Sequence, residues 1–182
     1  MASSLLYGTF FRRLIGAAAL DAATYEEVEG DESATNQAFA TVILSGLAGG
    51  VGAVGLGGTL SGVAFMATMS VLTWGVWAMI TYEIGVRVMR RPETRTDVGE
   101  LLRTMGFAAA PGGLLVLGAI PAVTIPVFAL TAIWMLAAMT VAVRQALDLD
   151  STARAVAVCA IGWALVTGIV VALGLVFGPS LA

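Results

Sequence analysis

The feature that most constrains this chain is a series of long apolar stretches, which begins near residue 37 and is interrupted by short clusters of arginines and acids. Hydrophobic residues make up 59% of the chain and charged residues only 12%, and the mean hydropathy is +0.95. A water-soluble domain of 182 residues cannot bury so much apolar surface. The sequence therefore predicts an all-α membrane protein with several helices that span the bilayer.

The residue types that the chain lacks restrict its chemistry. It contains no histidine and one cysteine, so histidine metal ligation, histidine acid–base chemistry and an internal disulfide are excluded for this chain. Cys159 has apolar neighbours, and we expect it to be a small buried hydrophobic residue. An enzyme needs a nucleophile, an acid–base pair or a metal. We find none of these, and we expect a protein without enzymatic activity, cofactor, metal or nucleic-acid partner.

Residues 1–36 are predicted to form a cytoplasmic N-terminal segment with two short helices. In the first, over residues 5–20, apolar side chains such as Phe10 and Leu14 recur at four-residue spacing, which is typical of an amphipathic helix. This helix either lies in the headgroup layer of the membrane or packs its apolar face on the protein's own helices.

The second N-terminal helix is short and acidic. Asp21 is placed to cap it, and Gly30 is a plausible end. The acids from Glu26 to Glu32 form either a metal or partner patch or a solvated capping region between two helices. The second interpretation requires no ligand, and we prefer it.

Residues 37–182 are predicted to form a membrane domain of five helices. The spans are expected at about residues 38–56, 61–89, 102–117, 127–146 and 153–177. The third is short and contains Pro111, which removes one backbone hydrogen bond and clashes with the preceding turn. We therefore predict a kink at Pro111, with a re-entrant pair of half-helices as the alternative.

Small residues predict two faces for close helix packing. Gly46 and Gly50 form a GxxxG pair in the first span, which allows another helix to approach to backbone distance. In the fifth span, small residues repeat every four positions and define one side of the helix: Ala160, Ala164, Gly168 and Ala172. Both patterns indicate contact with a neighbouring helix.

The arginines predict the orientation in the membrane. All nine basic residues are arginines, and they flank the start of the first span, the loop after the second and the turn after the fourth. With five spans they all lie on one side, which places the N-terminus in the cytoplasm and the C-terminus outside. At the end of the second span, Glu83 and Arg87 are four residues apart in the favourable order, and we predict that they form an interfacial ion pair.

Several segments resemble the Yip family of five-span membrane proteins, first known as interactors of Ypt/Rab GTPases, and in particular its bacterial branch. The resemblance is carried by residues 11–16 (Phe-Arg-Arg-Leu-Ile-Gly), 25–29 (Tyr-Glu-Glu-Val-Glu), 102–111 (Leu-Arg-Thr-Met-Gly-Phe-Ala-Ala-Ala-Pro) and 133–147, followed by Ser151-Thr152 and Arg154-Ala155. The eukaryotic relatives have an Asp-Leu-Tyr-Gly-Pro-like motif before the first span, which this chain lacks. GTPase binding is therefore not carried over.

The resemblance implies a five-helix bundle in the cell (inner) membrane with a cytoplasmic N-terminus. Our hypothesis for the function is a non-enzymatic scaffold or accessory subunit that packs against other membrane proteins, against a second copy or against lipid. The small-residue faces and the amphipathic helix favour it. The alternative is a small transporter or channel-like protein, which the Pro111 break and the glycine-rich first span would also suit.

Overall fold

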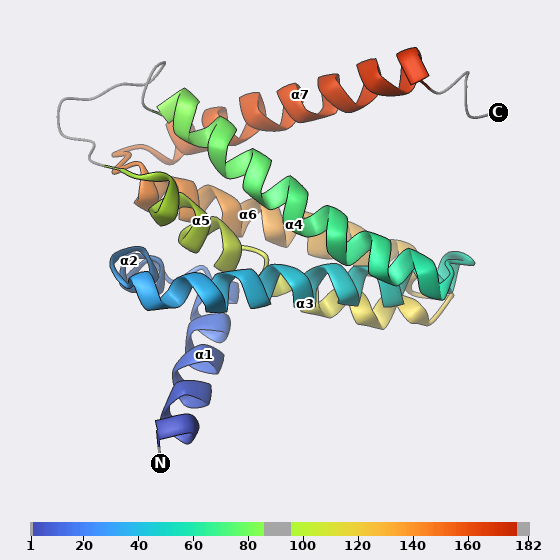
Figure 1. The fold of residues 1–182 in the computed structure, drawn as a ribbon, viewed down its shortest axis with the longest axis horizontal. Coiled ribbons are helices and arrows are strands. Elements are labelled where there is room, and N and C mark those ends of the chain that lie inside the picture. Colours follow the sequence, from blue (N-terminus) through green and yellow to red (C-terminus); the bar gives the residue numbers. More distant parts are fainter. Residues whose placement is uncertain (1, 86–95, 178–182) are drawn as a thin grey trace.

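The computed structural model describes residues 2–85 and 96–177, with side chains placed for residues 8–85, 96–165 and 168. The described residues form helices and turns without a strand (Figure 1). The helices are α1 (Ala2–Ala18), α2 (Ala22–Gly30), η1 (Glu32–Ala34), α3 (Thr35–Ala53), η2 (Val54–Leu56), α4 (Leu60–Glu83), α5 (Val98–Phe107), η4 (Ala110–Ala119), α6 (Thr124–Ala146) and α7 (Thr152–Phe177). The all-α prediction is confirmed.

Four helical segments are long and apolar enough to cross a membrane. They are Glu32–Leu56, Leu60–Glu83, Val98–Ala119 and Thr124–Ala146. The part of α7 with placed side chains contributes one shorter apolar helix, Thr152–Leu165. The structure therefore supports four of the five predicted spans by length and composition, and the fifth stays a prediction.

Side-chain caps explain where several helices begin. Asp21 accepts a hydrogen bond from the Ala23 backbone N–H at 3.3 Å and so caps α2, as the sequence predicted. The start of α5 is a capping box, in which the Asp97 carboxylate accepts from the Glu100 N–H at 2.8 Å and the Glu100 carboxylate accepts from the Asp97 N–H at 3.0 Å. These caps satisfy backbone donors that have no partner inside the helix.

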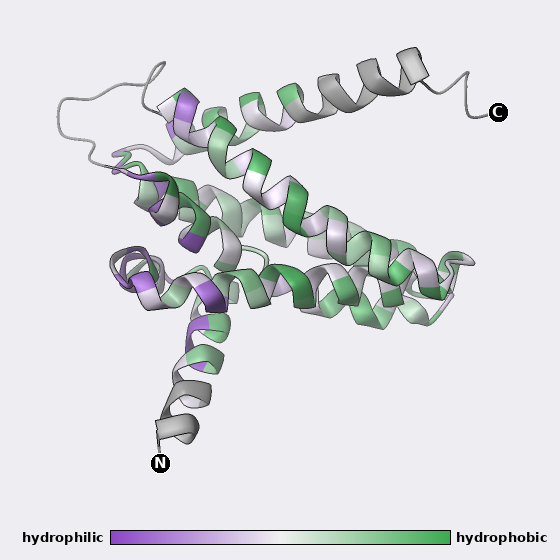
Figure 2. Ribbon diagram, viewed as in Figure 1, coloured by the Kyte–Doolittle hydropathy of each residue, from purple (hydrophilic) through white to green (hydrophobic). Residues whose placement is uncertain are grey.

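Hydrophilic residues gather at one end of the bundle, which we call the charged end. It holds α2, the start of α5 and the turn from α6 to α7, whereas the opposite end, with the turns 54–59 and 120–123, is apolar (Figure 2). Figure 1 shows α3 and α4 running between these ends and α1 projecting sideways across the direction of α3. In the described part of the chain the hydrophilic residues therefore gather at one end, and the side of the membrane on which this end lies stays a prediction.

One face of α1 packs on the rest of the protein. Phe10 lies against Phe107 with a ring-centroid distance of 6.4 Å, and Ala17 is fully buried. A second apolar pair on α1 points outward, because Phe11 is 59% and Ile15 is 69% exposed. The face with Phe10 and Ala17 therefore packs on the protein's own helices, which was one of our two interpretations, whereas the face with Phe11 and Ile15 is open.

The third predicted span differs from a single kinked helix. α5 ends at Phe107, and the chain continues as a 3₁₀-helix, η4, with Pro111 in its first turn. Proline is tolerated there because the first backbone N–H groups of a helix have no intrahelical acceptor. Pro111 therefore lies at the start of a new helical segment, after a break, and does not kink a continuous α-helix.

Two clusters of buried side chains hold the bundle together near the charged end. One joins α4, α5, α6 and α7 around Leu101, Met105 and Leu147. The other joins α1, α2, η1, α3, α5 and α6 around Tyr25 and Phe107. Cys159 belongs to the first cluster and is 1% exposed, which confirms that it is a buried hydrophobic residue.

Candidate functional site

The predicted glycine pair of α3 lies against α4. A β-carbon added to Gly46 would lie 2.8 Å from the Cα of Ala67, and one added to Gly50 would lie 2.5 Å from the Cα of Val63. Real side chains essentially never approach backbone atoms so closely, so only glycine fits at these two positions. Ser70 tightens the contact, since its hydroxyl lies 3.2 Å from the Val42 carbonyl oxygen and donates to it.

A second glycine row, at the end of α3 and in η2, lies against η4 and was missed by the sequence analysis. A β-carbon on Gly52 would overlap the carbonyl group of Leu115, and one on Gly55 would overlap the carbonyl oxygen of Gly118. With Gly49, which approaches the Leu115 side chain, these glycines repeat every three residues. The three-residue spacing is visible in the sequence. The sequence did not show that these glycines form a packing face, because that depends on η4, which is itself a 3₁₀-helix.

The buried face of η4 has the same three-residue period. Gly112 and Gly118 are buried and Leu115 is half-buried, whereas the positions on either side of Leu115 are exposed. A 3₁₀-helix has three residues per turn, so positions 112, 115 and 118 line up along one face. In an α-helix the same three positions would rotate by about 120° in total. The contact with α3 therefore fits η4 only in its 3₁₀ form.

The predicted small-residue face of α7 does not pack on another described helix of the chain. Ala160, Ala164 and Gly168 are exposed, and a β-carbon on Gly168 would meet no atom within 4 Å. Ala172 lies beyond the placed side chains. Another side of α7 does contact the bundle, where the buried Gly162 lies against the Trp77 indole.

The predicted ion pair between Glu83 and Arg87 falls at the edge of the described chain. Glu83 is the last residue of α4, and Arg87 lies outside the described residues. The pair therefore stays a prediction.

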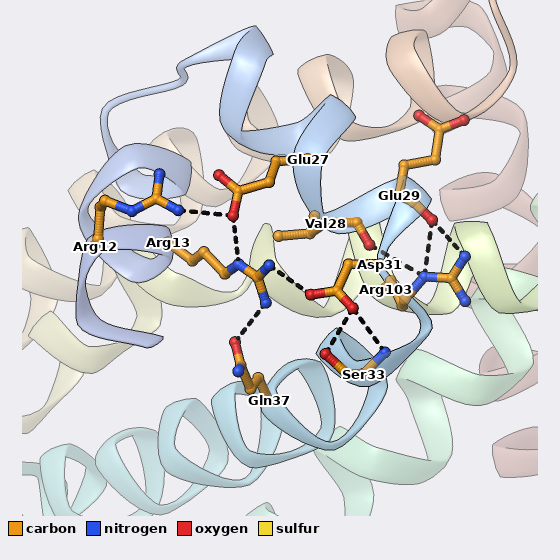
Figure 3. Close-up of polar contacts among 9 residues, drawn as sticks. All are labelled: Arg12, Arg13, Glu27, Val28, Glu29, Asp31, Ser33, Gln37 and Arg103. Carbon is orange, nitrogen blue, oxygen red and sulfur yellow. Dashed lines mark hydrogen bonds and ion pairs between the residues drawn. The ribbon is translucent and has the colours of Figure 1, made fainter. Parts of the chain in front are cut away.

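Arg13 of α1 is the centre of a buried polar network. It is 5% exposed, and its guanidinium donates to Glu27 at 2.9 Å, to Asp31 at 2.6 Å and to Gln37 at 3.0 Å (Figure 3). One side chain from α1 thereby fixes α2, η1 and α3. Arg12 also pairs with Glu27, at 2.7 Å, but its side chain is 60% exposed.

Two of the acids between Glu26 and Glu32 therefore serve an internal ion-pair network. The pKa of Asp31 is lowered because the Ser33 hydroxyl and the Arg13 guanidinium donate hydrogen bonds to its carboxylate. Among the described residues, no group of three or more Asp, Glu, Cys or His side chains is arranged to hold a metal ion. A signal was available in the sequence, because a pair of arginines in one short helix is followed by acids in the next.

Arg103 is a second buried arginine at the charged end. It is 6% exposed, and its Nε donates to the carbonyl oxygens of Val28 at 3.1 Å and Glu29 at 3.0 Å, while its Nη2 also donates to Glu29 (Figure 3). These carbonyls belong to the last turn of α2, where intrahelical donors are missing and the helix dipole is negative. Arg103 thus ties the end of α2 to α5.

The Glu29 side chain points away from this arginine (Figure 3). Among the described residues, no hydrogen bond or ion pair is made to its carboxylate. The pKa of Glu29 is raised to about 7, first because burial disfavours the charged form and second because the carboxylates of Glu100, Asp148 and Glu26 lie nearby; Arg103 opposes the rise. This carboxyl group therefore titrates near neutral pH.

The arrangement supports packing more directly than chemistry. Its features are two backbone-close contacts around α3, the network of Arg13 and Arg103 that holds the N-terminal helices, and an open small-residue face on α7.

The family model described as the Yip1 domain matches residues 9–173. The chain belongs to the Yip1 domain family. The resemblance seen in the sequence is thereby confirmed at the level of the family.

In this Yip1-domain protein, the matched region begins within α1 and ends within α7. The family domain therefore includes the Arg13 network as well as both glycine rows. Together with the apolar helices, the match indicates a membrane protein. No curated protein and no solved structure matches the chain.

Proposed function

We propose that this Yip1-domain protein is a non-enzymatic scaffold or accessory subunit of the bacterial inner membrane, which binds a helix of a partner membrane protein along α7. In this proposal α3, α4, α5 with η4, α6 and α7 all cross the bilayer. The charged end faces the cytoplasm together with the N-terminus, and the C-terminus is external. The gathering of hydrophilic residues at one end supports this orientation.

The open face of α7 carries the proposal. Between helices in lipid there is little hydrophobic driving force, so association depends on close packing, which small residues permit. The glycine rows of α3 are already occupied by α4 and η4. The face with Ala160, Ala164 and Gly168 has no such occupant among the described residues, and it is suited to a helix from outside the chain.

The exposed side of α1 supports a second attachment, to lipid. Phe11 and Ile15 are both more than half exposed and lie on one side of the helix. Figure 2 shows the coloured part of α1, which adjoins the bundle, as hydrophobic on the side toward the apolar end and hydrophilic on the side toward the charged end. In the proposal this helix lies in the cytoplasmic headgroup layer with its aromatic side toward the acyl chains.

The experiment is a comparison of Gly168→Leu and Gly168→Ser in native-like membrane discs. Leucine overfills a close helix contact, whereas serine remains small. We expect the leucine variant to lose its partner or its native assembly size while its own fold stays intact, and the serine variant to retain both. Native mass measurement distinguishes a foreign partner from a second copy.

A flux assay in vesicles tests the alternative of a small transporter. The break between α5 and η4 is the feature that would suit a transporter, because discontinuous helices are common at transport sites. If Gly168→Leu keeps its assembly size but loses a measurable solute or ion flux, the scaffold proposal is wrong.

A further inference from the structure

The 3₁₀-helix η4 is unusually long. It has ten residues, from Ala110 to Ala119, whereas 3₁₀ runs beyond about four residues are uncommon because their hydrogen-bond geometry is poorer than that of the α-helix. Its interior contains no charged residue. The contact with α3 favours this form, because it uses the three-residue period of Gly112, Leu115 and Gly118; Gly118 also lies against the Phe128 ring of α6.

The 3₁₀ form makes the segment longer. α5 and η4 run beside α3 in the same direction, since Gly106 lies against Ala38 and Gly118 lies against Gly52. Between these two contacts α3 advances by fourteen residues (38 to 52), whereas the segment formed by α5 and η4 advances by only twelve (106 to 118). A 3₁₀-helix rises about 2.0 Å per residue against about 1.5 Å for an α-helix. The extended form thus compensates for the shorter segment.

Both ends of η4 are attached to other helices, so a change in the length of η4 would be transmitted to α5 at one end and to α6 at the other. At the charged end, Arg103 ties α5 to the carbonyls of α2. At the apolar end, the Thr124 hydroxyl at the start of α6 donates to the Gly118 carbonyl oxygen at 2.6 Å. If η4 became α-helical it would shorten by about 5 Å, from about 20 Å to about 15 Å.

This change in length is comparable to the differences among natural membranes. Hydrocarbon cores range from about 27 Å to about 33 Å, and a mismatch with a protein costs a fraction of a kcal/mol per Å. A switch of η4 to α-helix would let the third segment shorten in a thin bilayer. It would also rotate Leu115 and Gly118 away from α3, so the glycine row would lose its close contact.

We propose that η4 is an element sensitive to bilayer thickness, which is 3₁₀-helical in thick bilayers and converts toward α-helix in thin ones, with the row Gly49, Gly52 and Gly55 stabilising the 3₁₀ form. The proposal rests on one part of the proposed function, that α5 and η4 cross the membrane. It does not depend on a partner at α7.

The test uses two spin labels at Gly113 and Ile120, in a Cys159→Ala background. Gly113 lies in η4 and Ile120 follows directly on its last residue. Both positions are accessible, since a β-carbon on Gly113 meets no atom within 4 Å and Ile120 is 57% exposed. Seven residues span about 14 Å of 3₁₀-helix but about 10 Å of α-helix. In an α-helix the two labels also return to the same side, which brings them closer still.

The protein is reconstituted in short-chain and long-chain phosphatidylcholine bilayers whose hydrocarbon cores differ by about 6 Å. We expect the distance between the labels, measured by electron paramagnetic resonance, to fall by about 3–4 Å in the thin bilayer. The control pair is Leu44 and Val51, which are seven residues apart and exposed on the α-helix α3. Its distance should stay constant.

A second comparison tests the glycine row. Gly52→Ala should give the shorter 113–120 distance even in the thick bilayer, whereas Ala53→Gly on the same helix should leave it unchanged. An unchanged 113–120 distance across the lipid series would overturn the proposal. Oxygen accessibility of the label at 113 separates the two ways of failing, because a label outside the hydrocarbon core would show that η4 does not cross at all.

Discussion

Gly52 of α3 and Leu115 of η4 are in backbone contact, so that a β-carbon on the glycine would lie 3.0 Å from the carbonyl carbon of Leu115 and closer still to its oxygen. The carbonyl belongs to the backbone and cannot rotate away as a flexible side chain could. Any side chain at position 52 must therefore separate the two helices. The stability of the bundle should depend strongly on this position.

We predict that Gly52→Ala destabilises the protein by about 1–3 kcal/mol, the usual cost of overpacking a tight contact. Gly113→Ala is the matched control in η4, because a β-carbon there meets no atom within 4 Å. It should be neutral or stabilising by up to about 1 kcal/mol, since alanine is the better helix former. Thermal unfolding in the same detergent measures both. Equal losses of stability would contradict the close contact.

Arg13 should matter far more than Arg12, although the two are adjacent. Removal of Arg13 breaks the link from α1 to Glu27, Asp31 and Gln37, and we expect a loss of about 2–3 kcal/mol, below the range for fully buried pairs because both carboxylates are about a third exposed. Arg12→Ala removes only an exposed pair, which is worth about 0–1 kcal/mol. Limited proteolysis of the N-terminal helices reports the difference. Similar cleavage rates in the two variants would show that Arg13 does not hold α1.

Glu29 should make the protein less stable as the pH rises toward neutrality. Its pKa in the folded protein is about 7, against a usual value of 4.5, so the folded state binds more protons than the unfolded state between these values. Stability should therefore fall from about pH 4.5 to about pH 7 and then stay level with respect to this group.

The variant Glu29→Gln removes this titration. It should raise the unfolding temperature at pH 8 and have little effect at pH 4, where the wild-type carboxyl group is already neutral. Glu32→Gln is the control, because Glu32 is exposed in η1 and lies outside the group of acids around Glu29. A Glu29→Gln benefit that is equal at both pH values would indicate a packing effect and not a charge effect.

The proposed orientation is tested by reporter fusions. A reporter that is active only in the cytoplasm should be active when fused after Glu100 and inactive when fused after Ala182, because the two positions lie on opposite sides if there are five spans. Activity at both positions would require an even number of spans and would place the C-terminus in the cytoplasm.

Composition and periodicity were enough to predict the class of protein and most of its helices. Lipid as the solvent requires long apolar helices, and these are visible as uninterrupted stretches with capping residues such as Asp21 at their ends. The close contact at Gly46 and Gly50 was also predicted from the sequence, because small residues four positions apart lie on one side of an α-helix and allow another α-helix to approach closely. These features depend only on residues close together in the chain.

The tertiary structure decided what depends on a distant partner. Gly49, Gly52 and Gly55 acquire their role only because η4 lies against them as a 3₁₀-helix, whose residues at a three-residue period face α3. Arg13 and Arg103 look like ordinary interfacial arginines in sequence. They are buried because acids and free carbonyls of α2 are brought to them. Local sequence decides where a helix can form, but the energy of a close contact or a buried charge is fixed by the group on the other side.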